Sequence, residues 1–468
     1  MRKDREQQKK ESGQLNIFRE VATPITTLTD RIVKGKMKGL ELSSRLEKQR
    51  TLTSHLLDKI VDYENLNKSY KQVLRNGGRS GVDKMETKDL GVWLGKHSPE
   101  LRSSLLREGY KVSAVLKVEI PKASGGVRTL GIPTVKDRLI QQAIHQELEH
   151  IYDPHFSEHS YGFRPNRNAH QAILQASHYI KEGKEWVVDI DLENFFDSIN
   201  HDRLMQRLSK GLGDKRVLRL INAFLKAGMM AGGLEEQRTA GTPQGGPLSP
   251  LLSNIVLDEL DKELELRGHS FCRYADDCNI YVSSRKAGER VMISITEFIE
   301  KKLKLKVNRI KSKVHHCSDG KFLGYTLLTD GDIRIADKSI DRLKDRIREI
   351  TKRSRGIAFI QVIKELNAVI IGWTNYFQLA NKWLSNIRDL DGWMRRKLRC
   401  YVLKQCGRKF TTYKLLRSLG IAESKSWNVV MYSQGWWNMT TKVAVNHAMG
   451  LQWFARQGLQ SLYLRLNV

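Results

Sequence analysis

The segment FCRYADDCNIY, from Phe271 to Tyr281, places two adjacent aspartates between two runs of apolar and aromatic residues. The pattern predicts two strands joined by a tight turn, with Asp276 and Asp277 at the turn. Aspartate is a common turn residue, so an exposed hairpin is one explanation. A metal site also needs concentrated negative charge on a rigid support, so a metal-binding hairpin is the other. The rest of the chain has to decide between them.

A second acidic strand lies upstream, in the run WVVDIDLENFFDSI that starts at Trp186. Asp189 and Asp191 are two residues apart, so on a strand they share one face, and the apolar residues beside them take the other. If this strand pairs with the hairpin, Asp191, Asp276 and Asp277 converge. Three carboxylates on a sheet suit Mg²⁺. Two such ions would activate a 3′-hydroxyl and stabilise a leaving pyrophosphate, which is nucleotidyl transfer.

The charge of the chain indicates a polyanionic partner. Its 468 residues carry a formal net charge of +28, with an isoelectric point near 9.8. Such a surplus favours nucleic acid or an anionic membrane. We expect no membrane span, because no run of about 18 apolar residues is present, and no secretory signal, because no apolar segment follows the basic N-terminus. Five cysteines without a C-x-x-C pair fit a reducing cytoplasm.

Patterning divides the chain into four expected regions. A basic extension over 1–55 precedes a region over 56–335 in which β-rich and helical runs alternate. This alternation predicts an α+β fold with a small antiparallel sheet. Helical periodicity then continues without strands through 336–410 and 411–468.

The helical part is strongly basic. Residues 341–420 contain 19 Lys and Arg against 6 Asp and Glu, and seven of the nine tryptophans lie at or beyond Trp373. Cations that meet phosphate and aromatic planes that stack on bases suit RNA. Packing in a core is the other explanation for the tryptophans, and we expect it for most of them, including Trp373.

Three segments resemble the palm motifs of reverse transcriptases. They are YADD from Tyr274, DLENFFD from Asp191 and TPQGGPLSPLLSNI from Thr242. Three more are similar to the group II intron-encoded subfamily: the finger-side blocks IPKASGGVRTLGIPT at 120–134 and SYGFRPNRNAH at 160–170, and the maturase (X, or thumb) segment LNAVIIGWTNYF at 366–377. The matches cover about 56 to 440 in the expected order.

This resemblance implies a right-hand polymerase. Fingers and palm would span 56–335, a helical thumb, or X, maturase domain 336–410, and a short region that binds DNA or RNA 411–468. Asp191 and Asp276 would be the essential ligands of two Mg²⁺ ions, with Asp277 as their partner in the turn. Asp189 would be structural.

The resemblance also implies contacts to the substrates. Phe196 would exclude a 2′-hydroxyl, so that dNTPs are preferred over NTPs. Further residues implied at the nucleotide are Lys122, Arg128, Gln244 and Lys311, of which Lys311 could donate a proton to pyrophosphate. Those implied at the primer and template are Tyr274, Gly324 and Arg164, and those implied at intron RNA are Arg395, Arg396, Lys397 and Arg399. For the two finger cations a solvated hairpin remains open, and for Lys311 an ordinary surface lysine.

The expected function is therefore RNA-directed DNA synthesis combined with maturase activity. The protein would copy intron RNA into cDNA and assist the splicing and mobility of its group II intron. Its partners would be intron RNA, an RNA template with a DNA primer, dNTPs and target DNA, in the bacterial cytoplasm and at the nucleoid. Two alternatives stay open: a splicing-only RNA-binding maturase, and a host-adopted relative in repair or defence. We expect no target-strand cleavage by the protein, because no H-N-H motif with paired cysteines follows the thumb segment.

Overall fold

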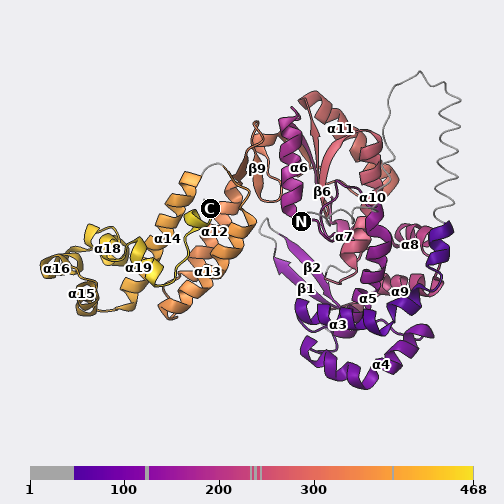
Figure 1. The fold of residues 1–468 in the computed structure, drawn as a ribbon, viewed down its shortest axis with the longest axis horizontal. Helices are drawn as coiled ribbons and strands as arrows, with labels where there is room; N and C mark the ends of the chain where they lie inside the picture. Colours follow the sequence, from indigo (N-terminus) through magenta and orange to yellow (C-terminus); the bar gives the residue numbers. More distant parts are fainter. Residues whose placement is uncertain are drawn as a thin grey trace, which may run out of the picture.

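The computed structural model describes residues 47–121, 126–231, 234–236, 240–242, 245–381 and 384–466. Most of the basic extension expected over 1–55 lies outside these residues. Figure 1 shows a body that holds two sheets with their helices, and an arm of helices that leads away from it. The α+β fold expected from the sequence is confirmed, with fingers and palm followed by a helical region.

The fingers are built on a four-stranded sheet in the order β2-β1-β4-β5. Its strands are β1 (Val115–Pro121), β2 (Val127–Ile132), β4 (Met229–Ala231) and β5 (Leu234–Glu236). Strands β1 and β2 form an antiparallel hairpin, but β1 and β4 run parallel. The small antiparallel sheet expected from the sequence is the palm sheet described below. The parallel pair arises because the chain leaves this sheet after β2 and returns only after a long crossover through part of the palm.

Helices cover the finger sheet and connect it to the palm. They are α2 (Leu56–Ile60), α3 (Tyr63–Asn76), α4 (Leu90–Leu106), α5 (Val135–Tyr152), α8 (His201–Gly211) and α9 (Lys215–Lys226), with the 3-10 turns η1 (Thr87–Asp89) and η2 (Asp153–His155). Helix α5 begins where Thr134 caps it, its hydroxyl accepting a hydrogen bond from Asp137 N. The sequence pattern predicts the bounds of this helix well, because its apolar residues recur at helical spacing.

The palm is an antiparallel sheet in the order β6-β7-β3-β8. Its strands are β3 (Trp186–Ile190), β6 (Ser270–Tyr274), β7 (Asp277–Val282) and β8 (Lys313–His316). Its other elements are α6 (Ala169–Lys181), α7 (Phe195–Ser198), α10 (Ser249–Leu266), α11 (Arg285–Phe298), the π-helical turn η3 (Ile299–Leu303) and the 3-10 turn η4 (Cys317–Asp319).

The two faces of the palm sheet belong to two different hydrophobic cores. Val188 and Ile190 pack into a core shared with the fingers, α10 and α11. Val187 and Tyr281, on the other face, pack into a second core that includes α6 and continues into the arm. Because side chains alternate along a strand, one strand serves both cores.

The arm begins with the hairpin of β9 (Tyr325–Leu327) and β10 (Ile333–Ile335). Its long helices are α12 (Asp337–Ile350), α13 (Phe359–Tyr376) and α14 (Leu384–Gln405). The helices that follow are α15 (Lys409–Ser418), α16 (Glu423–Tyr432), α17 (Gly435–Met439), α18 (Val443–Ala448), α19 (Leu451–Arg456) and α20 (Leu462–Leu466). Among the described residues no helix is both long and apolar enough to span a membrane.

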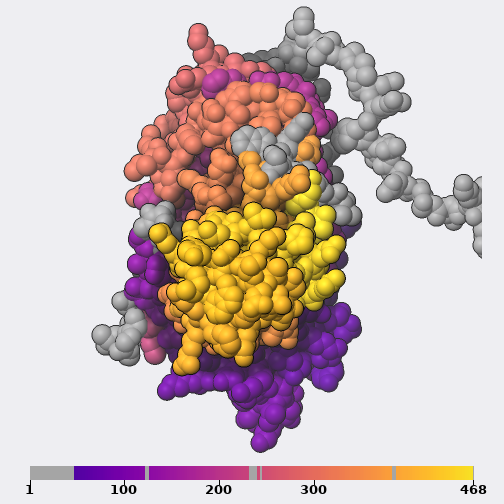
Figure 2. Space-filling model, turned by 90° about the vertical axis from the view of Figure 1, so that its left-hand side faces the viewer, coloured from indigo at the N-terminus to yellow at the C-terminus, as the bar shows by residue number. Residues whose placement is uncertain are grey.

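The last helix returns to the thumb. Helix α20 packs against α13 and α14, while α15 and α16 lie at the far end of the arm. Figure 2 shows these C-terminal helices as the part of the arm that stands in front of the body in that view. The domain boundaries near 335 and 410 stay predictions.

Candidate active site

The two aspartates of the hairpin stand at a two-residue turn. Tyr274 pairs with Asp277, which leaves Ala275 and Asp276 as the turn residues. Ala275 has a φ of 58°, the left-handed conformation that mirror-image hairpin turns require at their first central position. The turn matches the twist of the strands and places Asp276 and Asp277 at one end of the sheet.

Strand β3 brings the third carboxylate to the same end. Ile190 pairs with Cys278, so Asp191 leaves β3 beside the start of β7. Ile190 and Cys278 are buried on the face of the first core. Asp191 and Asp277, each one position away from them, are therefore on the opposite face.

A loop after η3 fixes the backbone of Asp191. Its N–H donates to Ser312 Oγ at 3.0 Å, and its carbonyl accepts from Asn308 N at 2.8 Å. The same loop carries Lys311, whose Nζ lies 3.4 Å from Asp191 Oδ2. The lysine side chain is 60% exposed, so this ion pair sits at the mouth of the site.

Like charges concentrate at this end of the sheet. The pKa of Asp277 is raised to about 6, first by burial and then by the carboxylates of Asp276, Asp189 and Asp191 in that order. Part of Asp277 nevertheless remains exposed to solvent. Burial also raises the pKa of Asp189 to about 6, against the attraction of Lys313. The site holds more negative charge than its own cations offset.

The chemistry of these donors, rather than their spacing in this structure, fits a divalent cation. Within the part of the chain that the structure describes, no three His, Cys, Asp or Glu side chains are grouped closely enough to hold a metal ion. Like-charged carboxylates repel one another, and Asp191 is paired with Lys311. Mg²⁺ selects hard, negatively charged oxygen donors and takes its remaining ligands from water and substrate phosphate.

Phe195 and Phe196, which follow Asp191 in the chain, differ in burial. In α7, Phe195 is buried, while Phe196 is half-buried against it with ring centroids 5.3 Å apart. Phe196 O accepts a hydrogen bond from Thr242 N at 2.7 Å. This bond joins the predicted nucleotide-excluding side chain to the start of the TPQGG segment.

Two glycines of that segment are tightly enclosed. A Cβ on Gly246 would lie 2.4 Å from Gln141 Oε1 in α5, and one on Gly245 would lie 3.1 Å from Gly131 O in β2. Gly245 also has a φ of 124°. The segment therefore passes close to the fingers, and Gly245 adopts a backbone conformation there that favours glycine.

Three residues expected at the nucleotide have different outcomes. Arg128 is exposed on β2, opposite Ile120, where its guanidinium is open to solvent. Lys122 and Gln244 lie outside the described residues.

Arg164, expected at the primer and template, is buried instead. Its side chain is 5% exposed, and its Nε donates to Asp153 Oδ1 at 2.7 Å. Its terminal nitrogens donate to the carbonyls of Asp153, Ser157 and Ser160. Protein acceptors occupy the guanidinium, so the structure places Arg164 in a supporting position, and its contact with primer or template stays a prediction.

Two other residues, Tyr274 and Gly324, were also expected to contact the primer. They lie where the palm meets the thumb. Tyr274 ends β6 and is half-buried. Gly324 lies in a tight turn between Phe322 and Tyr325 rather than in a strand, with a φ of 84°. Ser339 Oγ, from α12, donates to Gly324 O at 3.0 Å. The turn is therefore attached to the first long helix of the arm.

The basic cluster of α14 faces the C-terminal helices more than solvent. Arg395 pairs with Asp391 at 2.9 Å, with 16% of its side chain exposed. The Arg396 guanidinium lies over the Trp437 ring at 4.0 Å, and Lys397 lies 5.2 Å from the same ring. These contacts join α14 to α17 and explain a tryptophan that the sequence also associates with RNA.

Within this cluster, Arg399 differs most from the expected exposed position. It is 9% exposed, and its Nε donates to Met449 O at 3.2 Å. Burial lowers its pKa to about 10, with smaller contributions from Arg395 and Arg396. The guanidinium is buried and bonded to protein, so this structure gives the expected RNA contact by Arg399 no support, and that contact stays a prediction.

Sequence reasoning missed a polar group directly beneath the acidic hairpin. Arg273 is 0% exposed in β6 and pairs with Asp261, which is also 0% exposed in α10. The signal was present in FCRYADD, where an arginine interrupts a strand that is otherwise buried. A buried arginine requires a buried partner.

The chain matches two family models. Residues 120–327 match the model described as reverse transcriptase (RNA-dependent DNA polymerase), and residues 340–420 match the model described as group II intron, maturase-specific domain. The first covers the palm sheet, including Asp191 and the hairpin, and the second covers α12 to α15.

Curated relatives agree with these matches. Protein YkfC of Escherichia coli is 34% identical over 287 residues, which are 53% of this chain and 75% of YkfC. Group II intron-encoded protein LtrA of Lactococcus lactis is 44% identical over 141 residues, 30% of this chain and 23% of LtrA. The putative COX1/OXI3 intron 2 protein of Saccharomyces cerevisiae is 28% identical over 340 residues, 59% of this chain and 39% of that protein.

Fingers, palm and a helical thumb around two acidic strands define a template-copying polymerase. With the relatives and both family matches, the assignment becomes specific: the chain belongs to the reverse transcriptases of the group II intron-encoded type. It is an RNA-directed DNA polymerase with a maturase-specific region. The chain spans less than half the length of the yeast and Lactococcus relatives, so the functions of the whole protein are treated as proposals.

Proposed function

We propose that this protein copies intron RNA into DNA by two-Mg²⁺ nucleotidyl transfer at Asp191, Asp276 and Asp277. The observation that carries the proposal is the placement of these carboxylates on adjacent strands at one end of the palm sheet. Bound there, Mg²⁺ would supply the Lewis acidity that activates a primer 3′-hydroxyl and stabilises the leaving pyrophosphate.

The side chains around the carboxylates would handle the nucleotide. Lys311, now 3.4 Å from Asp191, would neutralise phosphate and donate a proton to the leaving group. Arg128 would reach the triphosphate from the finger hairpin with its fork of donors. Phe196 would fill the space that a ribose 2′-hydroxyl needs, so that dNTPs enter and ribonucleotides do not.

Primer extension on an RNA template tests the polymerase. The purified protein with a DNA primer, dNTPs and Mg²⁺ should extend the primer, and Asp276→Ala should abolish extension. Equal activity in Asp276→Ala would identify a contaminating polymerase. No extension by wild type would favour the splicing-only alternative.

We propose further that the maturase-specific region binds intron RNA through exposed cations of the thumb. Arg396 and Arg399 are engaged within the protein, so the support shifts to exposed lysines such as Lys352 and Lys364. Contact to phosphate by such residues gives a salt-dependent affinity and needs no carboxylate. Target DNA would be bound by the same arm, including its region 411–468.

A parallel assay separates the two roles. Lys352→Glu with Lys364→Glu should weaken binding of intron RNA and splicing while primer extension on a short template persists. Asp276→Ala should show the reverse. Loss of both activities in each variant would contradict the division of roles. Location of the coding frame inside an intron distinguishes a maturase from a host-adopted enzyme.

A further inference from the structure

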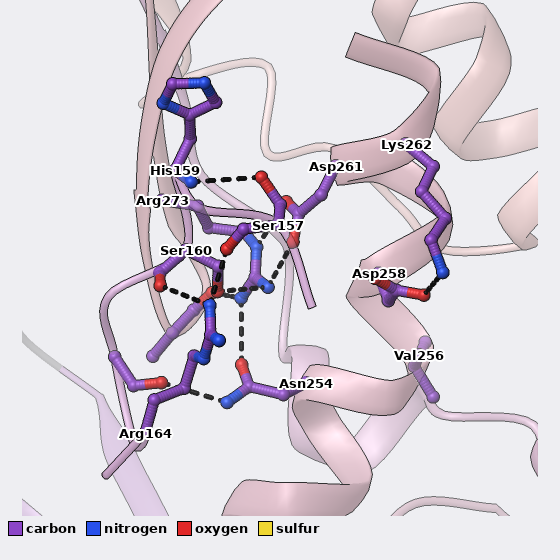
Figure 3. A network of polar contacts seen from close by, with 12 residues as sticks. Ser157, His159, Ser160, Arg164, Asn254, Val256, Asp258, Asp261, Lys262 and Arg273 are labelled. Atoms are coloured by element: carbon purple, nitrogen blue, oxygen red, sulfur yellow. Dashed lines mark hydrogen bonds and ion pairs between the residues drawn. The ribbon is translucent and has the colours of Figure 1, made fainter. Parts of the chain in front are cut away.

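The buried Arg273 has all of its hydrogen-bond donors occupied. A guanidinium carries five N–H groups. Nε and Nη2 donate to the two Asp261 oxygens at 2.7 and 2.5 Å. The remaining donors go to Asn254 Oδ1 at 3.0 Å, Ser160 Oγ at 2.7 Å and Ala275 O at 2.8 Å. Figure 3 shows Arg273 between α10, which supplies Asn254 and Asp261, and the segment that carries Ser160.

One of these five bonds ends on the acidic turn itself. Ala275 is the residue with positive φ, and its carbonyl is held by Arg273 Nη1. A left-handed alanine is uncommon and costs about 1 kcal/mol or more, so the turn would relax unless its surroundings fixed it. Arg273 acts from the face of α10, opposite to the face on which Asp191 and Asp277 lie.

A second support presses on the same turn from another segment. Gly162 packs so closely that an added Cβ would lie 2.3 Å from Ala275 N and 2.9 Å from Tyr274 C. Its carbonyl accepts from Asn254 Nδ2 at 2.9 Å, so the same asparagine contacts both Gly162 and Arg273. The turn is thereby confined between a backbone wall and a hydrogen bond.

The segment before Gly162 forms the outer layer of this support. Arg273 N donates to His159 O at 2.9 Å, and Tyr161 N donates to Arg273 O at 2.8 Å. The Arg164 guanidinium, also visible in Figure 3, donates to Ser160 O at 3.0 Å. Arg164 therefore fixes the strand-like segment that fixes Arg273.

We propose that Arg273 is a positioning residue of the polymerase site. Its guanidinium, with Gly162, sets the conformation of the Ala275–Asp276 turn and thereby the position from which the Asp276 and Asp277 carboxylates meet cation and nucleotide. This inference rests on the proposed function, because it takes Asp276 and Asp277 as the cation ligands. A role in stability alone is the competing explanation.

The sharpest variant is Gly162→Ala, because it moves the turn without touching a charge. Its matched control is Gly288→Ala, where an added Cβ in α11 would lie 2.6 Å from Val314 Cγ1 on the same sheet but away from the turn. Arg273→Lys is the second variant. A lysine keeps the charge opposite Asp261 but cannot supply five donors in a fork.

Cation binding is measured directly with Mn²⁺ as the probe, by the loss of its free electron paramagnetic resonance signal without nucleic acid present. For Gly162→Ala and Arg273→Lys we expect a Kd for Mn²⁺ raised about tenfold. In primer extension we expect kcat lowered about a hundredfold. KM for dNTP and Kd for template–primer should stay within about twofold of wild type, since the remaining contacts are intact. Gly288→Ala should lose thermal stability to a similar degree and keep both Mn²⁺ affinity and kcat.

The outcomes separate this inference from the proposed function. If Gly162→Ala and Arg273→Lys lose stability as Gly288→Ala does but bind Mn²⁺ like wild type, positioning is wrong and the network only stabilises the fold. If Asp276→Asn binds Mn²⁺ like wild type, the proposed metal site itself is wrong. If both main variants fail to fold, Ser160→Ala is measured instead, because it removes only one acceptor of Arg273. We expect a smaller loss of Mn²⁺ affinity in this variant. An unchanged Kd for Mn²⁺ would show that Arg273 does not position the site.

Discussion

The palm and the thumb each contain a buried arginine, and the two arginines have different structural roles. In the palm, Arg273 is enclosed beneath an acidic turn and donates to its backbone. In the thumb, Arg399 is enclosed within α14 and donates to the backbone of a later segment at Met449. Arg273 fixes the turn that carries two carboxylates of the proposed active site, and Arg399 fixes α14 against the segment at Met449. A cation in the sequence therefore indicates a partner but does not tell whether that partner is nucleic acid or protein.

The same comparison extends to the partly exposed charges of the two regions. At the end of the palm sheet, the Asp276 and Asp277 carboxylates repel one another, and a bound cation or a proton would relieve the repulsion. Along α14, Arg395 and Arg396 already have protein partners in Asp391 and Trp437. Carboxylates that repel one another indicate a site that binds a cation, whereas arginines with protein partners indicate a structural role.

The largest expected effect comes from removing one palm carboxylate. Asp276→Asn should reduce primer extension by about a thousandfold or more, because the cation loses a charged ligand. Thermal unfolding should show an equal or slightly higher midpoint, since one repelling charge is gone. An Asp276→Asn protein that extends primers at wild-type rate would place the reaction elsewhere.

In the thumb, the expected effect is on stability rather than on chemistry. Arg399→Ala leaves Met449 O without its donor and should cost about 2 kcal/mol of unfolding free energy. Its control is Arg388→Ala, an exposed position on the same helix, which should stay within about 0.5 kcal/mol. Denaturant unfolding measures both. Equal stability of the two variants, with loss of RNA binding only in Arg399→Ala, would return Arg399 to the RNA surface.

A smaller effect is expected where the palm selects its substrate. Phe196→Ala should raise the kcat/KM for ribonucleotides relative to dNTPs by about tenfold, because an obstacle to the 2′-hydroxyl is removed. Single-nucleotide incorporation with both substrates measures the ratio. Phe195→Ala is the contrasting variant: this ring is 2% exposed, so its loss should lower stability and leave the ratio unchanged.

The smallest effect concerns pH. The pKa of Asp277 is raised from 3.8 to about 6, so the folded protein binds more protons than the unfolded chain between these values. Stability without metal should therefore fall as pH rises through this window and change little above it. Mg²⁺ relieves the repulsion, so the gain in melting temperature with Mg²⁺ should appear as pH rises through about 6 and reach a few degrees. A gain that is equal at pH 5 and pH 7.5 would show that this carboxyl does not compete with the cation.

The sequence predicts the palm well because its information is local and periodic. Alternation in WVVDIDL and FCRYADDCNIY predicts the strands, their buried faces and the turn, and the register in the structure follows that alternation. Asp191 lies close to the hairpin as long as the strand before it pairs with the hairpin strand that follows Asp276. The roles of the individual site residues remain predictions.

The thumb contacts and the support of the turn were not predictable in the same way. Arg395, Arg396 and Arg399 lie on a helix whose buried side is set by helices far along the chain, so charge alone could not tell which of them face solvent. The partners of Arg273, among them Asn254 and Asp261, come from other segments, and local patterning does not assign such pairs. Long-range packing decides both cases.

The strand order of the palm has a consequence for how the chain folds. Strand β3 lies between β7 and β8, which both follow it at long range in the chain. During synthesis β3 is made well before either neighbour, so its two edges stay without partners while α7 to α10 are completed. Unpaired apolar strands of this kind favour aggregation and slow folding. A nascent chain that stalls before β8 would expose one edge of β3, and we expect such intermediates to depend on chaperones more than the helical arm does.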